Sequence, residues 1–258
     1  MKNSCYTGRM PAIEFNIHNH IGILTVNRPE VRNALNWEAM ADFATAVERA
    51  YATPSLQALI LTGAGKAFIS GGDVAELRDH NTKADARRMN TLMTEALNRL
   101  ADLPCVTIAA MEGPTRGGGC EAALACDWRV AAEDSDMGFV QVRLGLTTGW
   151  GGAARLVQLV GYPRALDLLA LGRVISAPEA HRIGIVTHLT PPDEALKSAI
   201  NIADAVSQYD PAAIRAYKRI LKAAQPSLAE AQRIEREAFP KLWAGEAHVK
   251  AVEKFLGT

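Results

Sequence analysis

The segment that decides the fold is residues 113–130, GPTRGGGCEAALACDWRV. An apolar strand leads into it, three consecutive glycines turn the chain, and a helix follows with Glu121 in its first turn. Glycines remove the Cβ atoms that keep ligands off the main chain, and a helix N-terminus carries partial positive charge. The segment therefore points backbone N–H groups and one carboxylate at a small volume suited to an oxyanion. A tight turn needed only for packing is the alternative interpretation.

Strand and helix patterns alternate on both sides of this segment. Residues 12–26 alternate apolar and polar around Asn19-His20, which predicts a β-hairpin, and helical spacing from Trp37 predicts a helix ending near Thr53. Further strands are expected near Leu59 and in PCVTIAAM and DWRVAAE, with a helix from the glycines at 71–72 to about residue 103. This order predicts an α/β fold with a partly parallel sheet.

Three regions are expected along the chain. Residues 1–10 have no pattern and are interpreted as a flexible N-terminal tail, and residues 11–190 as the strand-containing core. Residues 191–258 lack strand patterns and contain three helix-like stretches, separated at Asp210-Pro211 and Gln225-Pro226.

Composition excludes several classes of protein. Of the 258 residues, 28 are Lys or Arg and 28 are Asp or Glu, so the zero formal charge disfavours nucleic acid or an acidic membrane surface as a partner. The four cysteines are few and lack CxxC spacing, which favours a reducing, cytoplasmic setting. No apolar run approaches the length of a membrane span, and the N-terminus lacks the apolar stretch of a secretory signal.

A second glycine turn occurs in GKAFISGGDVAEL, residues 65–77. Asp73, followed three residues later by Glu76, is interpreted as a helix N-cap rather than a catalytic acid. Gly71 and Gly72 just before the cap allow close approach of a ligand to the backbone, so each of the two glycine loops could supply one N–H. The triple glycine lacks the spacing of a Walker loop or a dinucleotide site, which disfavours phosphate cradling.

Four segments together resemble the crotonase (enoyl-CoA hydratase/isomerase) superfamily. They are NRPEVRNAL, KAFISGGDVAEL, GPTRGGGCEAALACDWRVA and MGFVQVRLGLTTGWGGAARL, in that order, and the resemblance covers most of residues 12–258. It implies a spiral of ββα units with a C-terminal helical region used for assembly into a trimer or a dimer of trimers. It also implies an acyl-CoA substrate carried as the thioester, without a prosthetic group.

The resemblance assigns roles to four residues. The thioester oxygen is expected to be held by the backbone N–H groups of Gly72 and Gly118, because reactions beside a thioester pass through an enolate that such donors stabilise. Glu121 matches the first catalytic glutamate, with a helix-start acid as the structural alternative. Gln141 occupies the position of the second glutamate and cannot exchange a proton at neutral pH. Ordinary hydration and isomerisation both lose support from this departure.

The strings FVQVRLGLTTGWGG and LWAGEAHVKAVEKF resemble the ethylmalonyl-CoA decarboxylase branch of the superfamily. Decarboxylation of a 2-carboxyacyl-CoA, of the methylmalonyl- or ethylmalonyl-CoA type, leaves the enolate directly and needs no second carboxylate. Trp150 is part of this string, with core packing as its alternative role. A non-catalytic acyl-CoA-binding protein is the third hypothesis.

The resemblance also places the CoA moiety. It is expected beside the NRPEVRNAL loop and the segment after Lys66, with Arg116 interpreted as a solvated loop residue. The contacts expected are Arg32, Ala34, Ala67, Phe68, Ser70 and Lys254. The six histidines show no metal-binding spacing, so no metal site is expected, and no serine lies in a GxSxG motif.

Overall fold

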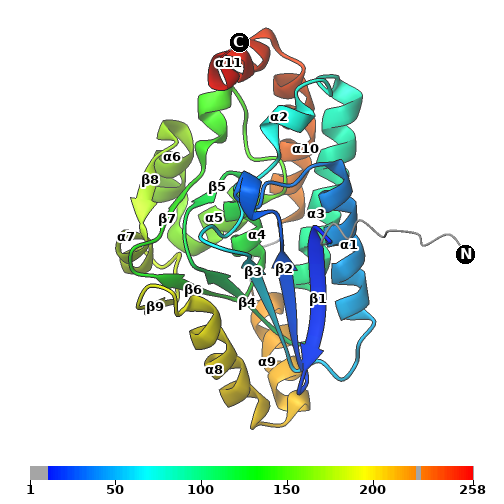
Figure 1. The fold of residues 1–258 in the computed structure, drawn as a ribbon, viewed down its shortest axis with the longest axis vertical. Coiled ribbons are helices and arrows are strands. Elements are labelled where there is room, and N and C mark those ends of the chain that lie inside the picture. Colours follow the sequence, from blue (N-terminus) through cyan, green and yellow to red (C-terminus); the bar gives the residue numbers. More distant parts are fainter. Residues whose placement is uncertain (1–10, 225–227, 258) are drawn as a thin grey trace, which may run out of the picture.

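Two β-sheets form the centre of the molecule (Figure 1). The computed structural model describes residues 11–224 and 228–257, so the tail expected at residues 1–10 lies outside the described residues. In the large sheet, in the order β1-β2-β3-β4-β6-β9, β1 and β2 are antiparallel and every other pair is parallel. Its strands are β1 (Ile13–His18), β2 (Ile21–Val26), β3 (Ala58–Gly63), β4 (Val106–Met111), β6 (Trp128–Ala132) and β9 (His188–Thr190). The small sheet contains β5 (Thr115–Arg116), β7 (Asp136–Gly138) and β8 (Val174–Ser176).

The predicted hairpin is confirmed. Its two-residue turn places Asn19 and His20 at φ values of +46° and +69°, the left-handed conformation that a tight hairpin turn requires at both central residues. Register follows from this turn, with His18 opposite Ile21 and Ile13 opposite Val26.

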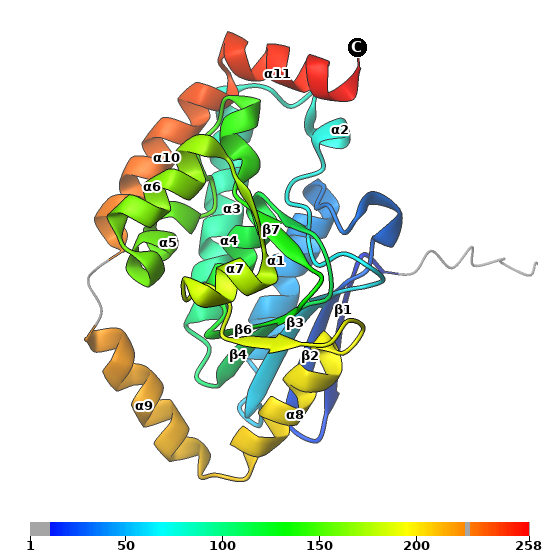
Figure 2. The same ribbon diagram turned by 90° about the vertical axis from the view of Figure 1, so that its left-hand side faces the viewer.

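Helices cover the two faces of the large sheet unequally. Side chains alternate along a strand, so Leu59 and Leu61 of β3 join the main core, whereas Ile60 joins a smaller core on the opposite face. Figure 2 shows α1 and α3 on one side of the sheet and α8 on the other, where Ala199 and Ala203 of α8 complete the smaller core. The helices up to residue 182 are η1 (Pro29–Val31), α1 (Trp37–Tyr51), α2 (Val74–Leu77), α3 (Lys83–Ala101), α4 (Gly118–Ala125), η2 (Val140–Leu144), α5 (Gly152–Val160), α6 (Tyr162–Leu171) and α7 (Ala177–Arg182).

The single helix expected from residue 71 to about 103 is two helices, α2 and α3. Thr82 separates them because its side chain accepts from the N–H of Asp85 while the Asp85 carboxylate accepts from the N–H of Thr82, a reciprocal cap that starts α3. Asp73 caps α2, as expected: its Oδ1 accepts from the N–H of Glu76 at 3.3 Å.

After β9 ends at Thr190, only helices follow in the described residues. They are α8 (Ala195–Ser207), α9 (Pro211–Ala223), α10 (Ala229–Trp243) and α11 (Glu246–Leu256). Asp210 caps α9 at the expected break, whereas the break expected at Gln225-Pro226 lies outside the described residues. The last expected stretch is divided at Gly245, which precedes α11. Figures 1 and 2 place α11 beside α2 at one end of the molecule and α9 at the other.

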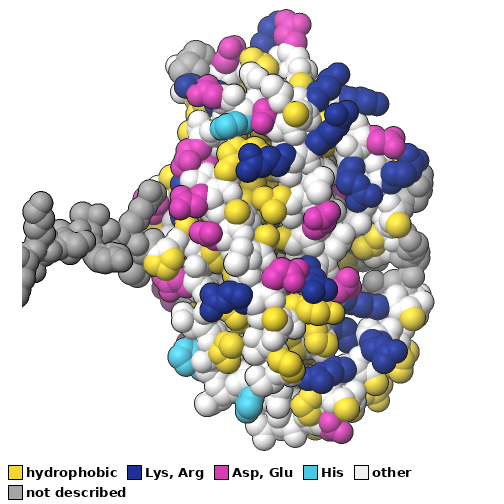
Figure 3. Space-filling model, turned by 90° about the vertical axis from the view of Figure 1, so that its right-hand side faces the viewer, with side chains coloured by type: hydrophobic (Ala, Val, Ile, Leu, Met, Phe, Trp, Pro, Cys, Tyr) yellow, Lys and Arg dark blue, Asp and Glu magenta, His cyan; other side chains and the backbone are white. Residues whose placement is uncertain are grey.

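Charges of both signs are interspersed on the face drawn in Figure 3, with hydrophobic side chains between them. This distribution agrees with the zero formal charge of the chain. None of the described helices combines the length and hydropathy needed to cross a bilayer.

Candidate functional site

The two glycine loops meet at the N-terminus of α4. A Cβ added to Gly71, whose φ is +92°, would lie only 2.9 Å from the backbone nitrogen of Gly118. Leu35 holds the Gly71-Gly72 loop in place, since its N–H donates to the carbonyl of Gly71 and its carbonyl accepts from the N–H of Asp73. As the first residue of α4, Gly118 has an N–H that no carbonyl of its own helix accepts. Gly72 and Gly118 line the same cavity, as the sequence predicts.

Close packing explains why glycine occupies positions 118 and 119. A Cβ at Gly118 would lie 2.2 Å from the Trp150 ring, and one at Gly119 would lie 1.9 Å from the carbonyl oxygen of Ile69. The helix α4 is buried along its whole length, which fits its apolar sequence. Packing therefore requires glycine at these two positions, and this requirement is compatible with a role in ligand binding.

Glu121 lines the cavity, it is 2% exposed, and four N–H groups surround its carboxylate. Its Oε1 accepts from Gln141 Nε2 at 2.9 Å and from the N–H of Gly149 at 3.2 Å, and its Oε2 accepts from the N–H groups of Trp150 at 2.7 Å and Gly152 at 2.8 Å. A helix-start acid would instead bind N–H groups of its own helix, so this contact pattern separates Glu121 from that role.

Opposing effects set the protonation of Glu121. Burial raises its pKa and the nearby Glu235 carboxylate raises it further, whereas the N–H groups of Trp150, Gly149 and Gly152 lower it, and the result is a pKa of about 7. Such a group can donate or accept a proton near neutral pH.

Residues 148–153 separate Glu121 from a second buried carboxylate, Glu235 of α10. Glu235 Oε1 accepts from the Thr148 hydroxyl and from the N–H of Ala153. Burial raises the pKa of Glu235 as well. Arg155 faces both carboxylates and also donates to the carbonyls of Trp150 and Gly151, so the turn is fixed from both sides.

Gln141 acts as a hydrogen-bond donor in this arrangement. It lies in η2, it is 9% exposed, and its amide nitrogen binds Glu121 Oε1. The four donors fill the four lone-pair positions of the Glu121 carboxylate. Gln141 is the only side chain among these four donors, and the other three are backbone N–H groups.

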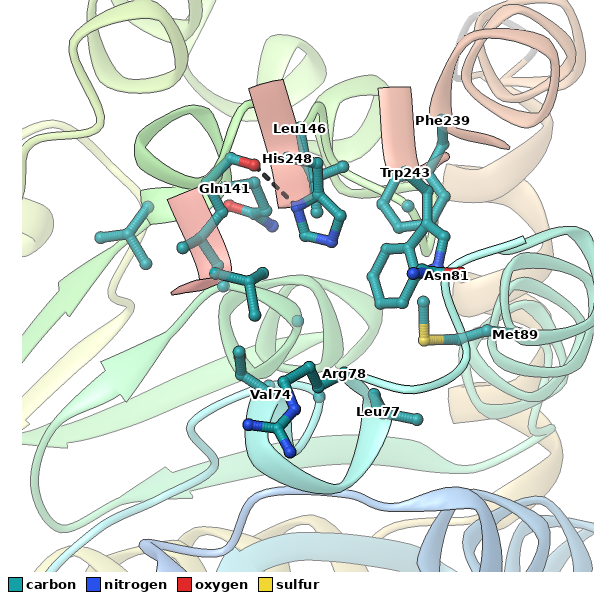
Figure 4. A pocket seen from close by; sticks show the side chains of 18 of the residues that line it. Val74, Leu77, Arg78, Asn81, Met89, Gln141, Leu146, Phe239, Trp243 and His248 are labelled. Carbon is teal, nitrogen blue, oxygen red and sulfur yellow. Dashed lines mark hydrogen bonds between the residues drawn. The ribbon is translucent and has the colours of Figure 1, made fainter. Parts of the chain in front are cut away.

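A cavity of about 450 Å³ extends outward from these residues. Its walls are largely apolar, and they come from the second glycine loop and α2, from η2 and the turn after it, and from α10 and α11 (Figure 4). This volume and lining suit a small-molecule ligand of intermediate polarity. Trp150 combines both roles weighed for it, since it is 3% exposed and also lines the cavity.

The CoA-contact predictions fall in different places. Ser70 lines the cavity, and Arg32 and Lys254 are exposed. Phe68 is completely buried, and its N–H donates to the carbonyl of Pro114. The carbonyls of Ala34 and Ala67 accept from Arg28 and Asn33. None of these positions contradicts the prediction, and all six contacts stay predictions.

Arg116 does not line the cavity. Its guanidinium binds the Asp136 carboxylate through two hydrogen bonds of 2.8 and 2.9 Å. Among the described residues no group of three potential ligands could hold a metal ion. The thiols of Cys105, Cys120 and Cys126 are buried, which raises their pKa values to about 11, 12 and 12.

Sequence reasoning missed the part of the site that the C-terminal helices supply. Phe239 and Trp243 of α10 and His248 of α11 line the cavity opposite α2 (Figure 4). The string LWAGEAHVKAVEKF contains two of them, but local spacing gives no sign that this segment lies beside residues about 100 positions earlier.

Comparisons with known proteins show the family of the chain. The model of the Enoyl-CoA hydratase/isomerase family matches residues 16–258. The Short-chain-enoyl-CoA hydratase of Clostridium acetobutylicum is 34% identical over 238 residues, covering 92% of this chain and 91% of that protein. The Ethylmalonyl-CoA decarboxylase of Gallus gallus is 33% identical over 241 residues, covering 92% and 81%.

The crystal structure of an enoyl-CoA hydratase/isomerase from Mycobacterium paratuberculosis has the same architecture. It matches with a TM-score of 0.88 at 26% identity, covering 95% of this chain and 99% of that one. The α/β arrangement predicted from the sequence is confirmed by this likeness. The chain belongs to the enoyl-CoA hydratase/isomerase family, and its fold is the crotonase fold of that family.

Proposed function

We propose that this protein transforms an acyl-CoA through the enolate of its thioester. The N–H groups of Gly72 and Gly118 hold the thioester oxygen, and Glu121 transfers the proton at Cα. Preorganised donors of this kind are each worth about 10² to 10³ in rate. The thioester supplies the activation, so this chemistry requires no prosthetic group.

The observation that carries the proposal is that three groups line one cavity. Gly72, Gly118 and Glu121 all line it, and the two glycine loops are in contact at Gly71. Glu121 has a pKa of about 7, which matches the demand of proton transfer near neutral pH. Trp150 packs over Gly118 and contributes an apolar wall beside the reacting carbon.

A second candidate, decarboxylation of a 2-carboxyacyl-CoA, is favoured by Gln141 and by the relative named Ethylmalonyl-CoA decarboxylase. The bond from Cα to the carboxylate breaks, its electron pair forms the enolate, and CO₂ leaves. Protonated Glu121 then gives its proton to Cα. Only one proton transfer is needed, so an amide at position 141 does not impede the reaction.

Incubation with a panel of acyl-CoA thioesters tests the proposal. The panel includes 2-enoyl, 3-enoyl, saturated and 2-carboxy thioesters, and mass spectrometry reads the products. A gain of one water indicates hydration, and a loss of CO₂ indicates decarboxylation. Isomerisation leaves the mass unchanged and is read from chromatographic retention. Binding without any conversion across the panel would contradict the proposal and favour a non-catalytic acyl-CoA-binding protein.

A further inference from the structure

His248 is the imidazole that faces the cavity described above. It lies in α11, it is 6% exposed, and it lines the same cavity as Glu121 and Gln141. Figure 4 shows the ring on the wall that also carries Gln141, with one nitrogen bound to a carbonyl and the other directed into the cavity. The proposed function uses Glu121 alone for proton transfer and leaves this group without a role.

The hydrogen bond of the ring fixes its tautomer. Nδ1 lies 2.8 Å from the carbonyl oxygen of Leu144, and a carbonyl only accepts, so Nδ1 carries the proton. In the neutral ring Nε2 is then a bare acceptor. Burial lowers the pKa of His248, which keeps the ring neutral at pH 7. The described residues give Nε2 no hydrogen-bond partner.

Neighbouring residues also hold the orientation of the ring. The Trp243 indole stacks on it with centroids 4.7 Å apart and planes at 33°, and this indole donates to the carbonyl of His80 at 2.7 Å. The backbone of α11 also packs closely on the turn after η2, since a Cβ added at Gly145 would lie 3.3 Å from the backbone nitrogen of His248. A catalytic base requires such a fixed ring.

The anchor of His248 and the amide of Gln141 belong to one segment. Leu144 ends η2, and Gln141 lies one turn earlier in η2. His248 is therefore bound to η2, the element whose position 141 would, by the family resemblance, carry the second carboxylate. The charged residues that line the same cavity are Arg78, Asp79, Glu121 and Glu253. The elements around the ring, η2, α10 and α11, also carry Arg143, Lys241, Glu246 and Lys250. Burial and the Leu144 carbonyl, rather than any of these charges, set the protonation of the ring.

We propose that His248 is a catalytic base that takes a proton at Nε2 during hydration of a 2-enoyl-CoA, in place of the carboxylate that position 141 lacks. The inference rests on the proposed function and narrows it to hydration with two proton-transfer groups, Glu121 and His248. Both groups reach the same cavity from different helices.

Atoms and protons balance in this step. Nε2 takes a proton from water while the water oxygen bonds to Cβ, and the electron pair of the Cα=Cβ bond moves to form the enolate. Protonated Glu121 then gives its proton to Cα. The products are a 3-hydroxyacyl-CoA, a His248 imidazolium and a Glu121 carboxylate. Exchange with solvent returns a proton to Glu121 and removes one from His248.

The test is His248→Asn in the full chain. The Asn Nδ2 takes the place of Nδ1 and keeps the bond to Leu144, but no basic nitrogen remains at the position of Nε2. We expect kcat for hydration of crotonyl-CoA to fall by about 10² to 10⁴, with KM nearly unchanged, as for loss of a general base. In the plot of kcat against pH, the limb that reports the titration of His248 should disappear. His18→Asn, in the exposed hairpin, is the matched control and should leave the rate unchanged.

A second reaction separates this inference from the proposed function. Exchange of the Cα hydrogen of butyryl-CoA with D₂O needs the enolate site and Glu121 but no water addition. His248→Asn should retain this exchange, which also shows that the variant is folded, whereas Glu121→Gln should lose it. Exchange without any hydration by the wild-type protein, or hydration unaffected in His248→Asn, overturns the role of His248. Absence of hydration by the wild-type protein overturns the inference alone, whereas the proposed function is overturned only when no thioester of the panel is converted.

Discussion

At the residue scale, the protonation of Glu121 depends on which neighbours carry charge. The side chain of Gln141 is neutral and donates to Oε1, so it does not oppose ionisation. Glu235 opposes it from behind the 148–153 turn. Replacing each neighbour in turn should therefore move the pKa of Glu121 in opposite directions.

Gln141→Glu should raise the pKa of Glu121 above about 7, because it removes a donor and places a second carboxylate beside the first. Exchange at Cα of butyryl-CoA in D₂O requires the Glu121 carboxylate, so its midpoint should move to higher pH, by about one unit or more as for carboxylates that share a site. Gln141→Asn, whose shorter amide adds no charge, is the control. An unchanged midpoint in Gln141→Glu would contradict this account.

Glu235→Gln should lower the pKa of Glu121, because the carboxylate that raises it becomes a neutral amide. The amide oxygen can still accept from Thr148 and Ala153, so the turn is kept. The midpoint of the same exchange reaction should move to lower pH. The reaction should therefore be faster than in the wild-type protein below pH 7 and similar well above it. A shift to higher pH, or none, would show that Glu235 does not act on Glu121 through its charge.

At the scale of elements, one buried arginine connects the loop after β2 to the helix that follows Gly72. Arg28 is 4% exposed and donates to the carbonyl of Ala34 at 2.6 Å, to Asp73 at 3.1 Å and to Glu76 at 2.7 Å. Asp73 is buried too, so it depends on this cation for compensation.

Arg28→Ala should destabilise the fold by about 3 to 5 kcal/mol, the usual cost of leaving a buried charge unpaired. Denaturant unfolding followed by circular dichroism measures the change. Arg173→Ala removes an exposed arginine bound to Asp167 and Glu179 and should cost only about 0 to 1 kcal/mol. Equal losses for the two variants would show that burial of the Arg28 pair has no energetic consequence.

Elements whose identity depends on neighbouring residues were predicted well. The Asn19-His20 turn, the first long helix and the cap at Asp73 all follow from local preferences, and the structure contains them. The division between α2 and α3 was missed, although Thr82 and Asp85 form a capping box that the sequence contains. The helical pattern of apolar residues continues across this start signal, so the pattern alone predicts a single helix.

Only those site residues that lie in recognisable motifs could be predicted from the sequence. Gly72, Gly118, Glu121 and Gln141 carry recognisable motifs, and the structure brings them to one cavity. His248 contacts Leu144 across 104 positions of sequence, and Thr148 contacts Glu235 across 87. No spacing rule connects segments so far apart, because their proximity results from packing of the whole chain.

At the scale of the whole molecule, α9 presents an apolar surface at the end opposite the cavity. No residue of α9 is buried, and Tyr217, Ile220 and Leu221 are 65%, 62% and 63% exposed. Apolar residues grouped in this way mark an interaction surface. We propose that it contributes to a homotrimer or dimer of trimers, the assembly that the family resemblance implies.

The variant Ile220→Lys with Leu221→Glu keeps the net charge of the chain and should reduce the mass in solution from three or six chains to one. Light scattering after size-exclusion chromatography measures it. Leu171→Lys, at an exposed leucine of α6, is the control and should not change the mass. A wild-type mass of one chain, or an assembly unaffected by the double variant, would contradict the role of α9.

The bond from His248 to the carbonyl of Leu144 has a consequence for biosynthesis. A ribosome makes the chain from its amino end, and domains can begin to fold as they emerge. The sheet, both glycine loops and Glu121 are all present by residue 190, but the cavity gains its last wall only with residues 239–253. A nascent chain can therefore complete its sheet while the cavity is still open to water. His248 is synthesised more than 100 residues after Glu121.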